Sequence, residues 1–187
     1  MRIISGEHRG RRINPPKGLP VRPTTDMARE GLFNILQNLI QFENIRVLDL
    51  FSGTGAVSFE FLSRRAAEVV AVDQHPACYR FISSFGRDLG YNNLKVFRMD
   101  WKTFLRRNND RKWDIIFADP PYDIKAGKEI HEAVFNGQYL APDGLLIIEH
   151  EGDEQLDDLP GFFQHRKYSR VHFTFFRTAS GPGLAQV

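Results

Sequence analysis

The sequence predicts an α/β fold built on a buried, mostly parallel sheet. Short apolar runs recur every 20 to 30 residues, and most of the segments between them have the apolar spacing of helices. This pattern is typical of βαβ units. Residues 162–168 and 171–176 alternate more between apolar and polar side chains, so we expect them to form an antiparallel pair that closes the sheet. The five apolar runs cover residues 47–51, 69–72, 94–97, 115–118 and 145–148.

Helix signals lie between these runs. We expect the first helix to begin after Thr25 as its N-cap, with Asp26 in the first turn, where the helix dipole favours an anion. Pro76 suits the first position of a later helix, and Gly90 ends that helix. Ahead of all of them, residues 1–20 are predicted to form a short β-hairpin arm.

Length and composition indicate one globular domain. The chain has 187 residues, of which 42% are hydrophobic and 26% charged, so it can bury a core without disulfides. Its one cysteine, Cys78, excludes an intrachain disulfide and a CxxC zinc site, and we expect no metal. The apolar runs are far short of a membrane span and no signal peptide is visible, so we expect a cytoplasmic protein. Residues 179–187 are small and rich in glycine and proline, and we expect them to fray.

Basic residues are concentrated near the N-terminus. Residues 1–29 carry a net charge of +5, whereas the rest of the chain carries −3. A basic arm on a slightly acidic body suggests contact with a polyanion, although a solvated, mobile tail would show the same charge pattern. We therefore divide the chain into an arm, residues 1–21, and a domain, residues 22–187.

An acidic residue stands at or just after the end of each predicted parallel strand. Ligands of open α/β sheets bind beyond the carboxyl ends of the strands, where these side chains would gather. One such acid would be a solvated turn, whereas five indicate a rim that accepts hydrogen bonds and attracts a cation. The five acids are Asp49, Asp73, Asp100, Asp119 and Glu149.

A glycine-containing loop follows the first strand. Gly53 and Gly55 let a ligand approach the backbone closely. Ser58 stands at the third glycine position of a dinucleotide fingerprint, and no phosphate-binding lysine follows, so a P-loop is excluded. Asp73, 18 residues after Gly55, can accept hydrogen bonds from ribose hydroxyls. These features fit a nucleoside cofactor without a pyrophosphate. S-adenosylmethionine is the obvious candidate because its sulfonium and ammonium groups are cations.

The sharpest motif is the tetrapeptide at residues 119–122. Pro120 and Pro121 fix the backbone and remove two amide donors. The Asp119 carboxylate and the carbonyl oxygens remain as acceptors beside the Tyr122 ring. Such a site suits an exocyclic amino group on a flat base, because the acceptors orient the amine and the ring stacks on the base. A proline-rich turn with an exposed aromatic ring is the structural alternative.

Two residues near this rim have two interpretations each. His75 could line the pocket of an adenine ring or be an ordinary loop histidine. Trp101 could stack on adenine or pack in the core. No GxSxG motif or nucleophile–base set is present, so covalent catalysis is not indicated.

Nearly the whole chain resembles one family of enzymes. It resembles the class I S-adenosylmethionine-dependent methyltransferases that act on exocyclic amines in DLFSGTG (49–55), Asp73, Asp100 and DPPY (119–122). More specifically, it is similar to the bacterial D-type guanine-N2 methyltransferases of 16S ribosomal RNA in RIISGEHRGRRI (2–13), RPTTDMAREGLFNIL (22–36) and RVHFTFF (170–176). The chain departs from the family at Met27, where a basic residue is frequent, and at Arg65, where glycine is common.

The resemblance implies a Rossmann-like sheet of seven strands, one of them antiparallel, with helices on both faces and a basic N-terminal β-hairpin arm. It implies S-adenosylmethionine as cofactor, and as substrate a guanine of 16S ribosomal RNA, free or in an assembling small ribosomal subunit. We expect a monomer. Carried over by position, the residues that bind the cofactor are Asp49, Ser52, Gly53, Gly55, Asp73, Asp100, Thr24 and Arg29. Those that face RNA are Arg9, Arg11, Arg12 and Arg22, and those at the reacting amine are Asp119, Pro120, Pro121 and Tyr122.

The implied reaction is an in-line displacement at the sulfonium methyl group by an exocyclic nitrogen, with the protein aligning and desolvating both reactants. Asp119 and the Pro120 carbonyl would accept hydrogen bonds from the amine. One alternative is an adenine-N6 methyltransferase of DNA or RNA, because DPPY does not separate the two amines. Another is a non-catalytic RNA-binding assembly factor. The intact acids and the intact DPPY motif make this alternative less favoured. Binding of S-adenosylmethionine by the purified protein discriminates enzyme from assembly factor.

Overall fold

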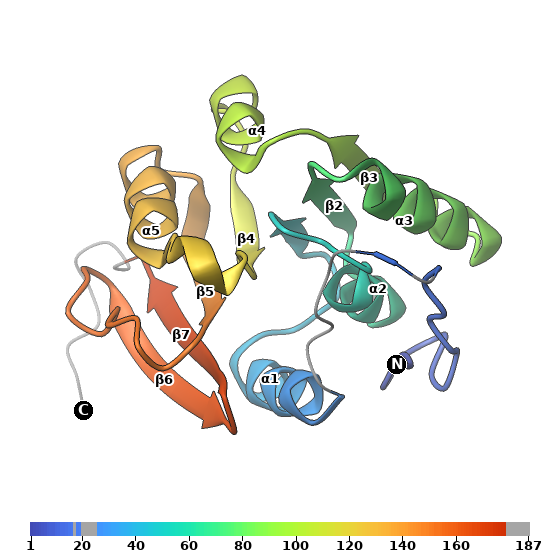
Figure 1. The fold of residues 1–187 in the computed structure, drawn as a ribbon, viewed down its shortest axis with the longest axis horizontal. Helices are drawn as coiled ribbons and strands as arrows, with labels where there is room; N and C mark the ends of the chain where they lie inside the picture. The colour runs from blue at the N-terminus through green and yellow to red at the C-terminus, as the bar shows by residue number, and fades with distance from the viewer. Residues whose placement is uncertain (17, 20–25, 179–187) are drawn as a thin grey trace.

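The protein folds around one seven-stranded sheet with the strand order β3-β2-β1-β4-β5-β7-β6. The computed structural model describes residues 1–16, 18–19 and 26–178. All strand pairs from β3 to β5 are parallel, and β7 runs antiparallel to both of its neighbours. The expected mostly parallel sheet with one antiparallel strand is therefore confirmed (Figure 1). The strands are β1 (Arg46–Asp49), β2 (Glu68–Asp73), β3 (Leu94–Arg98), β4 (Trp113–Ala118), β5 (Leu140–His150), β6 (Phe162–Tyr168) and β7 (Val171–Arg177).

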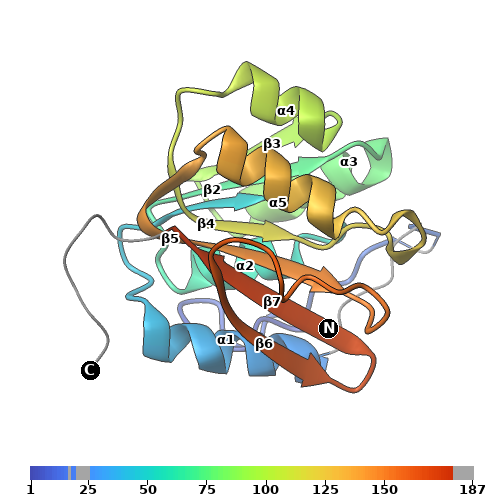
Figure 2. The same cartoon turned by 90° about the vertical axis from the view of Figure 1, so that its left-hand side faces the viewer.

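Helices cover both faces of the sheet because successive strand residues point to opposite sides, and both sides are apolar. On β1, Val47 packs into a core with α1, α2 and α3, whereas the next residue, Leu48, packs into a second core with α4 and α5. Figure 2 shows α4 and α5 on one side of the sheet and α1 and α2 on the other. The helices are α1 (Asp26–Leu39), α2 (Ala56–Ser63), α3 (Pro76–Asp88), α4 (Trp101–Arg107), the short 3-10 helix η1 (Tyr122–Ile124) and α5 (Gly127–Asn136).

Strands β1 and β5 and helix α4 are among the elements that differ from the expected ranges. The first strand ends at Asp49 instead of residue 51, because the chain turns at Ser52, whose hydroxyl donates to the Asp49 carbonyl. Strand β5 begins at Leu140 instead of residue 145, and it runs through a proline and a glycine, which are uncommon inside strands. Helix α4 was not predicted, although Asp100 is its N-cap and accepts from the Thr103 amide at 3.1 Å.

The N-terminal arm is docked on α2. Backbone hydrogen bonds join Ile3 to the carbonyl of Arg11 and Gly10 to the carbonyl of Ile3, both at 2.9 Å, although the hairpin makes only one isolated β-bridge. The carboxylate of Glu60, fully buried in α2, accepts from the amides of Ile4 at 2.7 Å and Ser5 at 3.1 Å. A solvated, mobile tail therefore does not describe residues 1–13.

The structure describes both positions at which the chain departs from the family pattern, Arg65 and Met27. Arg65, at the position where the family commonly has glycine, has φ 69°, so the turn before β2 does require the left-handed region that glycine adopts easily. Met27 is 58% exposed on α1. The expected N-cap Thr25, the boundary between residues 21 and 22, and the fraying of residues 179–187 lie outside the part of the chain that the structure describes.

The docked arm predicts different tolerances at two glycines with the same backbone conformation. Gly6 and Gly10 both have φ 83°, but a Cβ at Gly6 would lie 1.9 Å from the Ser63 carbonyl oxygen, whereas a Cβ at Gly10 would meet nothing within 4 Å. We expect Gly10→Ala to cost about 1–2 kcal/mol for the left-handed conformation alone. Gly6→Ala should cost clearly more, because the arm must also move away from α2. Urea unfolding of both variants tests this, and equal losses would contradict the docking.

Candidate functional site

A cavity of about 1200 Å³ opens at the carboxyl ends of the central parallel strands. Four of the five predicted rim acids line it, and Glu149 lies next to it in β5. The same cavity is lined by Ser52 and Gly53 of the glycine loop and by all of Asp119, Pro120, Pro121 and Tyr122. The structure thus brings together the predicted cofactor loop and the predicted amine site in one space.

Some predicted residues lie elsewhere. Gly55 and Arg29 are not among the described residues that line this cavity, and neither are Arg9, Arg11 and Arg12 of the arm. Arg29 is fully buried in α1, where its Nη2 donates to the Arg2 carbonyl and pairs with Asp26 at 2.9 Å. Thr24 and Arg22 fall outside the described part of the chain.

The glycine loop is held by its own polar groups. The two oxygens of Asp73 accept from the amides of Gly53 at 2.8 Å and His75 at 2.7 Å, which ties the loop after β1 to the loop after β2. The Ser52 hydroxyl donates to the carbonyls of Asp49 and Val72. These contacts give the loop a fixed shape before any ligand binds.

Gly55 has a structural reason to be glycine. Its φ is 75°, and a Cβ there would lie 2.7 Å from Cε2 of Phe59 and 3.0 Å from Cγ1 of Ile82. The glycine therefore lets α2 start tightly against α3. Its predicted role in binding the cofactor stays a prediction.

Asp49 is a buried carboxylate with unsatisfied acceptor capacity. Its side chain is 1% exposed, Oδ2 accepts from the Ser58 hydroxyl at 2.6 Å, and Oδ1 has no hydrogen-bond partner among the described residues. Burial raises the pKa of Asp49 to about 7; the Ser58 hydroxyl opposes this rise, the nearby Asp73 adds to it, and the backbone amides of Phe51 and Ser58 oppose it weakly. An orphaned carboxylate oxygen at the cavity is the acceptor that a cationic ligand would satisfy.

The loop after β3 contributes Asp100 and Trp101. Asp100 uses Oδ1 to cap α4. Trp101 is 6% exposed and belongs to the second core, 6.2 Å from the Phe51 ring centroid, and it also lines the cavity. His75 caps α3 by accepting from the Ala77 amide and lines the cavity too. Both residues thus have a structural role, and their contact with an adenine ring stays a prediction.

The DPPY segment leaves β4 and ends in η1. Burial raises the pKa of Asp119 well above its usual value, and the carboxylates of Glu149 and Asp49 raise it further. The Tyr122 hydroxyl donates to Oε1 of Glu149 at 3.0 Å, and Glu149 is 1% exposed. Burial and Glu149 likewise raise the pKa of Tyr122, so the phenol stays protonated. The ring is therefore fixed at its polar end by a buried acid from the neighbouring strand. The place of Glu149 on the rim was predicted from the sequence, but its contact with Tyr122 was not.

The sheet order, the single antiparallel strand, the glycine loop with its acid partner and the DPPY segment after β4 define a class I methyltransferase of Rossmann-like fold. The chain belongs to the family described as Conserved hypothetical protein 95, whose model matches residues 1–177. This membership and the relatives below confirm the resemblance drawn from the sequence.

Named relatives and solved structures are similar over most of the chain. Ribosomal RNA small subunit methyltransferase D of Escherichia coli strain K12 is 32% identical over 160 residues, which is 86% of this chain and 79% of that protein. The solved structure of the Escherichia coli protein yhhF superposes with a TM-score of 0.83 at 29% identity, covering 95% of this chain and 97% of that one. An RNA methyltransferase of Salinibacter ruber in complex with S-adenosyl-L-homocysteine shares the fold, with a TM-score of 0.63 at 10% identity over 88% of this chain and 100% of that one.

The described residues contain neither a membrane-spanning helix nor a cluster of metal ligands. None of their helices is long and apolar enough to cross a membrane. Within the same ranges, no group of three or more His, Cys, Asp or Glu side chains could hold a metal ion.

The raised pKa of Asp49 predicts a pH-dependent stability difference. Between pH 4 and 7, Asp49 is ionised in the unfolded chain but protonated in the folded protein, so folding binds a proton and rising pH costs stability. Asp49→Asn keeps an acceptor for Ser58 and loses this dependence. Without ligand, we expect the free energy of unfolding of the variant to rise relative to that of the parent by up to about 1.4 kcal/mol per pH unit in this window. Above pH 7 the difference should stay constant. Urea unfolding from pH 4 to 8 checks this, and a constant difference would contradict the assignment.

Proposed function

We propose that this protein transfers a methyl group from S-adenosylmethionine to the exocyclic N2 of a guanine in 16S ribosomal RNA. Ribosomal RNA as the substrate class is supported by the name of the relative, which shares about a third of its residues with this chain. An exocyclic amine as the group that accepts the methyl is supported by the DPPY segment, whose carboxylate and ring line the same cavity as the glycine loop. The setting is cytoplasmic and the protein acts as a monomer, on free RNA or on an assembling small ribosomal subunit.

The residues that line the cavity fit the cofactor. Asp49, with its orphaned oxygen, would accept from the ammonium group of the methionine part, beside Gly53. Asp73 would share its two oxygens between the loop amides and the ribose hydroxyls, and Asp100 would accept from the adenine amino group. When bound, S-adenosylmethionine supplies an electrophilic methyl group. The proposal also includes cofactor contacts from Thr24, Gly55 and Arg29.

Asp119 and Tyr122 would divide the work at the target base. Asp119 and the Pro120 carbonyl accept from the amine and set its direction, and positive charge that develops on the nitrogen is stabilised by the acids around it. Tyr122 stacks on the base through its ring, and its hydroxyl donates to Glu149. The base reaches this site by leaving its own stack, which single-stranded RNA loops allow most cheaply.

Two other functions are separated from this one by specific outcomes. An adenine-N6 methyltransferase would use the same DPPY contacts, so identification of the methylated nucleoside decides between them. A non-catalytic RNA-binding factor would not need an unsatisfied carboxylate in a 1200 Å³ cavity. Calorimetric titration with S-adenosylmethionine separates that class, because the enzyme binds the cofactor and the assembly factor does not.

Substitutions at the amine site should affect transfer and leave cofactor binding unchanged. Asp119→Ala should collapse single-turnover transfer of labelled methyl to a 16S ribosomal RNA substrate, because the amine loses its orienting acceptor. Asp110→Ala, the same change on an exposed loop, is the matched control and should behave as the parent.

Two substitutions of Tyr122 distinguish the contribution of its ring from that of its hydroxyl in the same assay. Tyr122→Ala should lose about 1–3 kcal/mol of base stacking, whereas Tyr122→Phe should retain most activity because it keeps the ring. Near-normal methyl transfer by the Asp119→Ala variant would contradict the role of Asp119 in orienting the amine. A Phe variant as inactive as the Ala variant would shift the role of Tyr122 from the ring to the hydroxyl.

A further inference from the structure

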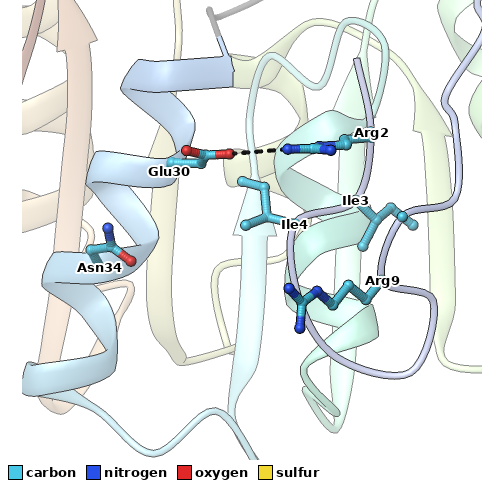
Figure 3. A pocket seen from close by; sticks show the side chains of 7 residues that line it. Arg2, Ile3, Ile4, Arg9, Glu30 and Asn34 are labelled. Carbon is cyan, nitrogen blue, oxygen red and sulfur yellow. Dashed lines mark ion pairs between the residues drawn. The ribbon is translucent and has the colours of Figure 1, made fainter.

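A second hollow lies between the arm and α1, away from the strand ends. It has a volume of about 320 Å³. Arg2 and Arg9 of the arm form one wall and Glu30 and Asn34 of α1 the other. Figure 3 shows both guanidinium groups extending from the arm toward α1. We call this hollow the arm cleft.

The arm cleft has more positive than negative charge. Arg2, whose side chain is 63% exposed, approaches Glu30 at 3.9 Å, the outer limit of an ion pair. Arg9 is exposed and has no ion pair within the described residues. Two guanidinium groups therefore face one carboxylate. An exposed pair at such a distance contributes little to stability, so an anion of higher charge density can replace the carboxylate at low cost.

The cleft is fixed in shape by buried contacts beneath it. The side chain of Ile3 is 1% exposed, and the backbone hydrogen bonds of the hairpin hold Arg2 and Arg9 on the same arm. Arg29, buried under the arm, donates through Nη2 to the Arg2 carbonyl. Its charge is paired with Asp26 at 2.9 Å, and its Nε and Nη1 have no hydrogen-bond partner among the described residues. The two exposed guanidinium groups thus stand on an anchored backbone over a third, buried one.

We infer that the arm cleft binds a phosphodiester group of the RNA substrate between Arg2 and Arg9. An arginine fork matches phosphate oxygens, and the Asn34 amide supplies a neutral donor on the opposite wall. Glu30 is the resident counter-charge that the phosphate displaces from Arg2. The other exposed arginines of the same arm, Arg11 and Arg12, make RNA the source of the phosphate rather than a small anion, because a continuous strand can contact them in turn.

This inference rests on the proposed function, in which Arg9 already faces RNA, and adds to it a defined site with three further residues. Arg2, Glu30 and Asn34 had no predicted role, and none of them lines the cavity at the strand ends. A phosphate contact here would position the RNA without reading its sequence. It would also explain why an otherwise exposed arm is anchored so firmly to α2.

Matched charge changes test the cleft by RNA affinity and its salt dependence. Arg2→Gln should weaken binding of a 16S ribosomal RNA transcript by about threefold to tenfold and lower the salt slope by about one phosphate contact. Arg46→Gln, the same change on an exposed residue at the start of β1, should keep the parent's slope. Affinity for S-adenosylmethionine, measured in parallel, should not change in either variant.

Substitution of Glu30 should change RNA affinity in the opposite direction, an effect that a general loss of structure would not produce. Glu30→Gln should tighten RNA binding by about twofold to threefold, since Arg2 no longer has a competing carboxylate. Glu43→Gln is the control, because Glu43 is also an exposed acid in a long ion pair, with Arg65 at 3.7 Å. Asn34→Asp should weaken binding by bringing a second carboxylate into the cleft.

The outcomes separate this inference from the proposed function. The arm cleft alone would be overturned if the parent protein binds and methylates the transcript but a cleft variant has the same RNA affinity as its control. The two comparisons are Arg2→Gln with Arg46→Gln and Glu30→Gln with Glu43→Gln. Parent protein that neither binds nor methylates ribosomal RNA would overturn the proposed function and the cleft with it.

Discussion

Carboxylates gathered at one edge of the sheet are the constraint on which the site depends. Parallel strands bring their carboxyl ends to one edge, and in this chain each of those ends carries an acid. Two exposed acids of the cavity form ion pairs with lysines, Glu129 with Lys102 and Asp153 with Lys125. The inner acids Asp49 and Asp119 instead have pKa values raised by burial and by neighbouring carboxylates. Their burial costs stability in the empty protein, and a ligand that brings positive charge relieves that cost.

Helix α2 connects this edge to the basic arm. Its N-terminus starts at Gly55, directly after the loop whose Gly53 amide donates to Asp73. Along its length, buried Glu60 and Ser63 hold the arm through backbone amides and carbonyls. The proposed cofactor loop and the proposed RNA-binding arm are thus attached to one short helix (Figure 1). If both proposals hold, this helix would set the distance between the methyl donor and the RNA backbone.

The sequence was informative where local chemistry decides the structure and less so where distant contacts decide it. Alternating and continuous apolar runs predicted the strands, and the acids at their ends predicted the cavity. The extra length of strand at residues 140–144 was missed, because only Leu140 pairs with β4 there, and the proline and the glycine lie in an irregularity before the pairing resumes at Leu145. The docking of the arm was missed because Glu60 lies more than 50 residues from the amides that it binds. The contact of Tyr122 with Glu149 likewise joins two strand ends 27 residues apart.

The most direct test is the nucleoside composition of 16S ribosomal RNA from cells with and without the gene, read by mass spectrometry after nuclease digestion. If the buried acids and the DPPY segment serve a guanine-N2 methyltransferase, one N2-methylguanosine disappears with the gene. It should return with the parent gene and fail to return with the Asp119→Ala variant. Unchanged N2-methylguanosine, or loss of N6-methyladenosine in its place, would contradict the account.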